Sequence, residues 1–179
     1  GAMDPWALTV GNRLLGNPDC AAGLEMTLQG PELFFEQRLS IVITGADLSP
    51  ASNGHAVPMW TVVTMPAGSR LQFGLRRHGT RAYLAVAGGI EVPLLLGSRS
   101  THVRSGLGGV GGRPLRKSDR LEVGSARGST AGHEGRTLAP SSRPQYLASP
   151  TLRVMPGPQV NHFLEEALHV LTSSAYRVT

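Results

Sequence analysis

The sequence predicts a mainly β protein, a small barrel or sandwich that carries a few short helices. In residues 22–37 and 39–48, apolar and polar side chains alternate with a period of two, which is typical of strands. Turn-forming residues separate such stretches, since the 179 residues include 23 glycines and 13 prolines. Many short strands at even spacing, joined by such turns, indicate a barrel or two packed sheets.

One short helix is expected before the strands. Asp4 is a suitable N-cap, Pro5 fits the first helical position, and apolar residues follow at roughly helical spacing up to Leu15. Gly16 and the Asn-Pro pair after it end the helix, because neither continues a helix well. We therefore expect a helix of about three turns.

The other strands follow in order along the chain. Residues 56–74 predict a strand, a Pro-Ala-Gly turn and a second strand, after a tight turn at Asn53 and Gly54. Residues 81–89 predict a further strand and residues 120–124 a short last one. These elements complete the expected barrel.

The composition changes after the last of these strands. Residues 125–149 are rich in Gly, Ser, Pro and Arg and poor in apolar side chains, so they predict a loose connector. Residues 151–159 predict a strand, and 161–174 an amphipathic helix with Asn161 as N-cap. We therefore expect a first subdomain over 1–124, a flexible linker over 125–150 and the start of a second subdomain over 151–179.

The formal net charge is +5 at pH 7, and the basic residues are concentrated in one block. Between Arg76 and Arg127, ten Arg or Lys residues stand against three acidic ones. Binding to nucleic acid would call for aromatic side chains or a recognition helix, yet Tyr83 is the only aromatic residue there. We expect no nucleic-acid partner. The basic block either binds a small anion, a carboxylate or a phosphate, or forms a solvated basic face.

The sequence also favours one cell compartment. No apolar stretch approaches the roughly 18 residues that cross a bilayer, and the N-terminus lacks the pattern of a signal peptide. The single cysteine, Cys20, cannot form an internal disulfide, which fits a reducing compartment. We expect a cytoplasmic protein with no membrane partner.

Common enzyme motifs are either absent or lie in a sequence context that does not fit them. Residues 106–111 match the dinucleotide-binding pattern G-x-G-x-x-G, but Pro114 stands where the helix of that motif should run. The sequence contains neither a P-loop nor the G-x-S-x-G nucleophile elbow. Its six histidines and one cysteine lack the spacing of a metal site, so we expect no metal.

A polar stretch beside the glycine run is the candidate binding site. Hydroxyls and guanidiniums on a glycine-rich loop can hold an anion through charge-assisted hydrogen bonds, or the hydroxyls can cap turns while the arginines lie in solvent. We expect residues 90–96 to anchor this loop in apolar surroundings. The carboxylates placed near turns can take part in a site or cap the backbone. The candidate site residues are Ser98, Arg99, Ser100, Thr101, Arg104, Arg113, Asp4 and Asp47.

Four stretches, residues 1–31, 43–47, 81–124 and 152–159, resemble the allophanate hydrolase subunit 2 family, also called KipA or PxpC. The domain of that family is similar to the carboxyltransferase half of urea carboxylase. The most specific stretch is AGGIEVPLLLGSRST. The resemblance implies a cyclophilin-like β-barrel and the opening of a second one. It also implies that the family's strand region before Gly1 and most of its second half after Thr179 are missing here.

The resemblance further implies a partner, a subunit 1 protein of the KipI or PxpB type, and an ATP-dependent complex that acts on a lactam or amide. One branch converts 5-oxoproline to glutamate with a third, PxpA-like subunit. A second transfers carboxyl from carboxybiotin to urea. A third, KipA-like branch regulates a kinase inhibitor without catalysis. The Met-Lys-Met sequence that carries biotin is absent, so biotin would have to come from another protein.

Overall fold

The computed structural model describes residues 1–126, 132–147 and 151–176. The chain divides into two compact units, Gly1–Ala148 and Ser149–Thr179. Within the described ranges no helix is long and apolar enough to cross a membrane.

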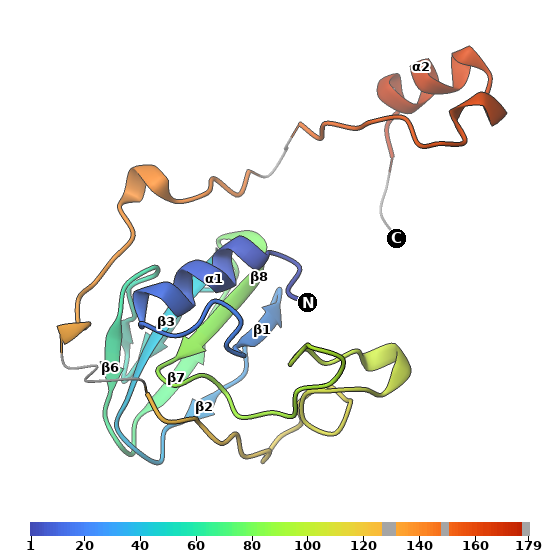
Figure 1. The fold of residues 1–179 in the computed structure, drawn as a ribbon. Coiled ribbons are helices and arrows are strands. Elements are labelled where there is room, and N and C mark those ends of the chain that lie inside the picture. Colours follow the sequence, from blue (N-terminus) through green and yellow to red (C-terminus); the bar gives the residue numbers. More distant parts are fainter. Residues whose placement is uncertain (127–131, 148–150, 177–179) are drawn as a thin grey trace. The chain divides into compact units, whose positions relative to one another are not determined.

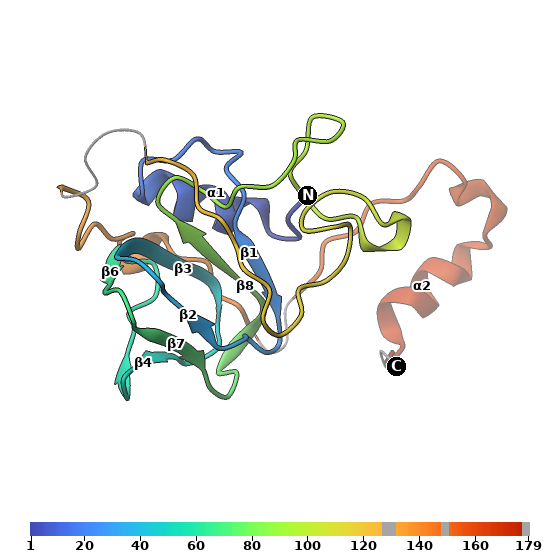
Figure 2. The ribbon, with the colours of Figure 1, turned by 90° about the horizontal axis from the view of Figure 1, so that it is seen from below.

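The first unit consists of two four-stranded antiparallel sheets (Figures 1 and 2). One sheet has the order β1-β8-β3-β6 and the other β2-β7-β4-β5. The predicted fold class, mainly β with a few short helices, is confirmed. The strands are β1 (Leu24–Thr27), β2 (Leu33–Phe34), β3 (Leu39–Asp47), β4 (Pro50–Ser52), β5 (His55–Ala56), β6 (Val63–Met65), β7 (Arg70–Phe73) and β8 (His78–Val86).

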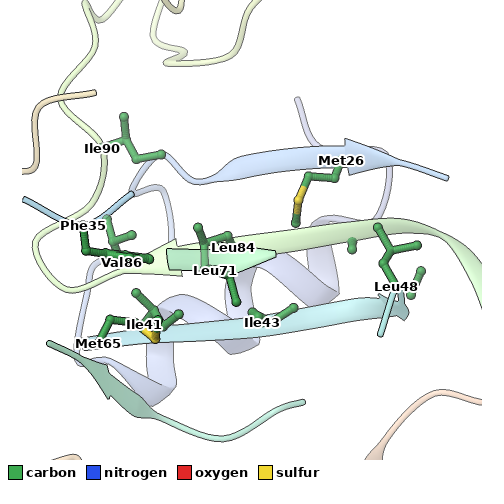
Figure 3. Packing of buried hydrophobic residues seen from close by; sticks show 12 residues of the cluster. Met26, Phe35, Ile41, Ile43, Leu48, Met65, Leu71, Leu84, Val86 and Ile90 are labelled. Carbon is green, nitrogen blue, oxygen red and sulfur yellow. The ribbon is translucent and has the colours of Figure 1, made fainter. Parts of the chain in front are cut away.

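The core lies between the two sheets (Figure 3). Ile41 and Ile43 of β3 point into it, together with Leu84 of β8 and Leu71 of the second sheet. The alternate residues of β3 face the other side, where Val42 packs in a separate cluster beneath the N-terminal helix. Because both faces of β3 are covered, nearly all of its residues are buried.

The expected N-terminal helix is α1 (Pro5–Leu14), which lies across β3 and β8 in Figure 1. Asp4 is its N-cap, as predicted, and accepts a hydrogen bond of 3.0 Å from the Ala7 amide. The hydroxyl of the buried Thr44 donates to the Ala7 carbonyl at 2.8 Å. These two contacts fix the start of the helix on the sheet.

Part of the expected connector is bound to the first unit. The Val62 amide donates to the Arg136 carbonyl, the Val62 carbonyl accepts from the Gly135 amide, and the Leu138 amide donates to the Trp60 carbonyl. Residues 132–138 thus satisfy backbone groups beside β6, at the edge of its sheet. We expected a loose connector here because few apolar side chains occur, but backbone pairing needs none. A 3₁₀ helix, η3 (Pro140–Ser142), follows.

The predicted strand over 120–124 is reduced to one bridge, between Ile90 and Val123. Residues 127–131, which belong to the expected linker, lie outside the described residues.

In the second unit, the strand expected over 151–159 is absent from the described residues. A strand requires a hydrogen-bonded partner, and this segment has none among them. A 3₁₀ helix, η4 (Val160–His162), precedes α2 (Glu165–Ser173), whose N-cap is Leu164 instead of the expected Asn161. The second barrel stays a prediction.

Candidate functional site

A long loop, residues 91–122, leaves the sheets after β8 and returns beside its own start; we call it the rim loop (Figure 2). Its base is closed by the Ile90–Val123 bridge and by hydrogen bonds from the Glu91 amide to the Glu122 carbonyl and from the Gly124 amide to the Gly89 carbonyl. The rim loop contains the predicted anion-binding residues other than the two aspartates.

The polar stretch of the rim loop begins in a hairpin turn. Leu95 and Ser98 exchange backbone hydrogen bonds of 2.8 and 2.9 Å. Leu96 and Gly97 between them both have positive φ, 49° and 75°, as a primed two-residue turn requires. The Ser98 hydroxyl accepts a hydrogen bond from the Ser100 amide at 3.1 Å. Ser98 therefore caps the turn, which is one of the two roles that the sequence left open for these hydroxyls.

The glycine run lets two chain segments approach closely. A side chain at Gly108 would overlap the Ser100 carbonyl, and one at Gly109 would overlap the Thr101 hydroxyl. Both glycines have positive φ. The glycines therefore let the chain pack closely against residues 100 and 101. This close packing explains why residues 106–111 match the dinucleotide-binding pattern.

The three predicted arginines of the rim loop differ in their contacts. Arg113 holds Asp119 through two hydrogen bonds of 2.8 and 2.9 Å. This pairing and the Arg116 amide keep the pKa of Asp119 far below its usual range. Among the described residues, the side chains of Arg99 and Arg104 make no hydrogen bond. Arg113 therefore stabilises the loop, while Arg99 and Arg104 are available to an anion.

The leucines before the polar stretch are not in apolar surroundings. Ile90 is buried, but Leu94, Leu95 and Leu96 are 61%, 44% and 98% exposed. The expected anchor therefore holds for Ile90 and for Val92, which packs against the core, and is wrong for the three leucines, because the tip of an isolated hairpin has no neighbouring strand to cover it. Val103 and Leu107, at the 3₁₀ helix η1 (Val103–Ser105) and just after it, are exposed as well.

Asp4 lies in a second polar cluster. Its carboxylate accepts from the Tyr146 hydroxyl at 2.8 Å in addition to capping α1. Its amide donates to the Tyr83 hydroxyl, which in turn donates to Glu25 at 2.9 Å. Burial, opposed by the Asp4 amide and reinforced by the Glu25 carboxylate, raises the pKa of Tyr83 to about 12. The network joins the N-terminus, two strands and the segment around Tyr146.

Asp47 lies at the end of β3, at a β-bulge. The register between β3 and β8 shifts between Gly45 and Asp47, which places Asp47 opposite His78. Bulges commonly redirect a side chain near a functional site. The Asp47 carboxylate accepts from the Ser49 amide at 2.7 Å and lies 3.6 Å from the guanidinium of Arg77.

Two cavities meet at Asp47. One has a volume of about 460 Å³, and the polar residues in its lining are Asp47, Ser49 and Arg77. The other, of about 300 Å³, is lined by Asp47, Trp60, His78, Arg143, Gln145 and Tyr146. Asp4 and Asp47 are therefore related through Tyr146, which bonds to one and shares a cavity with the other.

The predicted residues thus fall into two groups. The rim loop holds six of them, whereas Asp4 and Asp47 lie in the cluster around Tyr146, and no hydrogen bond within the described ranges joins the groups. Sequence reasoning missed Arg143 and Tyr146, because their segment resembled a loose connector. His78 had no motif to mark it, since its position depends on the bulge in β3.

The sequence matches the family "Carboxyltransferase domain, subdomain A and B" over residues 1–179. It is 38% identical over 165 residues to a 5-oxoprolinase subunit of Escherichia coli K12, covering 91% of this chain and 50% of that protein. The chain belongs to the carboxyltransferase-domain family, and the resemblance found in the sequence is confirmed.

Solved structures agree with this assignment. The crystal structure of TTHA0988 matches with a TM-score of 0.80 and 34% identity, covering 97% of this chain and 61% of that one. The Kluyveromyces lactis urea carboxylase matches with a TM-score of 0.67 and 33% identity, covering 86% of this chain and 14% of that one. The chain therefore spans half the length of the E. coli 5-oxoprolinase subunit and a smaller part of the carboxylase.

Proposed function

We propose that this protein is a subunit of an ATP-dependent complex that hydrolyses a lactam or amide, with 5-oxoproline as substrate and glutamate as product. The observation that carries the proposal is the 38% identity to the E. coli 5-oxoprolinase subunit, which extends over 91% of the chain. In the reaction, water adds to the lactam carbonyl carbon and the ring C–N bond breaks. The freed nitrogen becomes the amine of the product, and hydrolysis of ATP to ADP and phosphate drives the step.

The rim loop supplies groups suited to this chemistry. Substrate and product both carry a carboxylate, and the reaction with ATP releases phosphate. Arg99 and Arg104 have guanidiniums that make no hydrogen bond within the described part of the chain. A guanidinium can bind either anion through two parallel hydrogen bonds. We assign Arg99 to anion binding, with the hydroxyls of Ser100 and Thr101 beside it.

The same loop is the proposed contact with a subunit 1 partner of the KipI or PxpB type. Leu94, Leu95, Leu96, Val103 and Leu107 are all exposed in this one loop. An apolar surface next to arginines has the composition of a protein interface, in which an apolar centre is surrounded by polar groups. In this assembly Arg99 lies beside the partner, and a PxpA-like protein is the third member of the complex.

A second candidate function is carboxyl transfer from carboxybiotin to urea. It is favoured by the match to the carboxyltransferase family and by the structural likeness to a urea carboxylase. In this case biotin is carried by another protein. A non-enzymatic KipA-like regulator that binds a kinase inhibitor is the remaining alternative.

The test measures glutamate formed from 5-oxoproline and ATP by the full-length protein together with its subunit 1 and PxpA-like partners. We expect glutamate with the full set and none when any member, or ATP, is omitted. Turnover that is unchanged without this protein contradicts the proposal. Carboxylation of urea with a biotinylated carrier, in place of glutamate formation, identifies the second candidate. Tight binding to subunit 1 without either reaction identifies the regulator.

A further inference from the structure

The 300 Å³ cavity is formed by four segments that are distant in sequence. The end of β3 contributes Asp47, the turn before β6 contributes Trp60, the start of β8 contributes His78, and residues 140–146 complete the lining. Its volume lies at the lower end of the range of about 300–1,000 Å³ found for small-molecule sites. A cavity of this volume suits a compact ligand.

The cavity lining includes a positive charge, that of Arg143. The Arg143 guanidinium is oriented by hydrogen bonds from its Nε to the Leu138 carbonyl and from its Nη2 to the Thr137 hydroxyl, at 3.0 and 3.1 Å. Its other N–H groups make no bond within the described ranges, and the residue lines the cavity. A guanidinium held on one edge presents the rest of its donors in a fixed direction, which suits a carboxylate.

The lining also includes a carboxylate, that of Asp47. The Asp47 side chain is only 15% exposed, and one of its oxygens is occupied by the Ser49 amide. The other oxygen lies 3.6 Å from Arg77, whose side chain is 70% exposed, so this ion pair is weak. The carboxylate can therefore still accept a hydrogen bond from an N–H group in the cavity.

Aromatic side chains line the same cavity. The rings of His78 and Tyr146 are stacked, with centroids 6.4 Å apart and planes at 13°. Trp60 is buried and has a φ of 61°, a left-handed conformation that a bulky residue rarely adopts. Backbone strain of this kind is concentrated at functional sites, where the surrounding structure maintains it.

We propose that this cavity binds a small molecule that carries both a carboxylate and an amide or lactam N–H, with the carboxylate at Arg143 and the N–H at Asp47. Trp60 and Tyr146, which line the same cavity, contact the ligand. The inference rests on the proposed function, because this chemical class includes the proposed substrate. With the substrate carboxylate at Arg143, the anion that Arg99 binds is the phosphate released from ATP. It assigns a binding role to Arg143 and Tyr146, which no sequence motif indicates.

The first test uses three probes with the full chain labelled with nitrogen-15. We expect 5-oxoproline to shift the backbone amide resonances of Asp47, His78 and Gln145. We expect 2-pyrrolidinone, which lacks the carboxylate, and cyclopentanecarboxylate, which lacks the N–H, to bind at least tenfold more weakly. Equal binding of all three probes, or shifts confined to the rim loop, overturns the inference.

The second test uses matched variants. R143Q should weaken binding of 5-oxoproline at least about tenfold, which corresponds to about 1.4 kcal/mol. R143K, which keeps the charge but not the planar fork, should fall between R143Q and the wild type. R38Q removes an exposed charge away from the cavity and should leave binding unchanged. Equal effects of R143Q and R38Q contradict the assigned role of Arg143.

The outcomes also separate this inference from the proposed function. If the complete complex hydrolyses 5-oxoproline while R143Q leaves the KM unchanged and the probe does not shift the cavity resonances, the cavity assignment is wrong and the function stands. If the cavity binds 5-oxoproline but the complex forms no glutamate, the binding site stands and the proposed reaction is wrong.

Discussion

Replacing Gly88 by alanine should detach the base of the rim loop. Gly88 has a φ of 89°, and its amide donates to the Asn17 side chain at 2.9 Å. A Cβ at this position would overlap the backbone carbonyl of Gly124, which belongs to the returning end of the loop. The backbone cannot move aside as a flexible side chain can. The two chain segments that close the base of the rim loop, around Gly88 and Gly124, must therefore separate.

The expected loss of stability has two parts. The positive φ costs an L-residue about 1–2 kcal/mol, and forcing an extra methyl into a packed site typically costs about 1–3 kcal/mol. We therefore expect Gly88→Ala to lower the free energy of unfolding by about 2–5 kcal/mol. The matched control is Gly97→Ala, where φ is 75° but the space around the Cβ is open. That change should cost only about 1–2 kcal/mol.

Urea unfolding followed by far-ultraviolet circular dichroism measures both free energies, and limited proteolysis shows whether the rim loop opens. Gly88→Ala should be cleaved between residues 91 and 122 faster than Gly97→Ala. If the two variants lose the same stability and are cleaved at the same rate, the close contact at Gly124 does not hold the loop.

Three other changes test the first unit. Thr44→Val should cost about 1 kcal/mol in urea unfolding, since it removes the hydroxyl that bonds to the Ala7 carbonyl; no loss would contradict its role in seating α1. The pKa of Tyr83 is raised to about 12 from an ordinary value of about 10, so stability should be complete below about pH 10 and fall between about pH 10 and 12. Tyr83→Phe should weaken this fall, and an unchanged profile would refute the assignment. The depressed pKa of Asp119 means that its bond to Arg113 stabilises the fold above the ordinary Asp pKa and is lost at lower pH. Asp119→Asn should therefore flatten the acid limb of the stability profile, and a limb as steep as in the wild type would count against it.

Local patterns in the sequence were sufficient for the helix and the main strands. The cap at Asp4 and the proline after it act within a few residues, so α1 was predicted at its observed place. The period of two likewise marked β3, and the strand expected over residues 81–89 overlaps most of β8. Both kinds of pattern depend on near neighbours in the chain.

The remaining features depend on contacts that the sequence does not show. The backbone pairing of Gly135 and Arg136 with Val62 needs no apolar side chain, so composition predicted a free connector there. The cavity at Asp47 exists only because a bulge sets Asp47 opposite His78 and because Arg143 is brought from far along the chain. The leucines at the hairpin looked like an anchor, because apolar residues are usually buried.

The central claim is that this chain contributes reacting or binding groups to the complex and is more than a scaffold. The most direct measurement is the kcat/KM for ATP-dependent glutamate formation from 5-oxoproline by the reconstituted complex, comparing Arg99→Lys with Arg116→Lys. Both changes keep the charge, but only Arg99 is assigned to an anion through its planar fork. We predict a loss of at least about tenfold, or about 1.4 kcal/mol, for Arg99→Lys and nearly none for Arg116→Lys. Equal small effects of the two substitutions would contradict the claim, because only bulk charge would then matter and the hairpin would be a turn of the barrel.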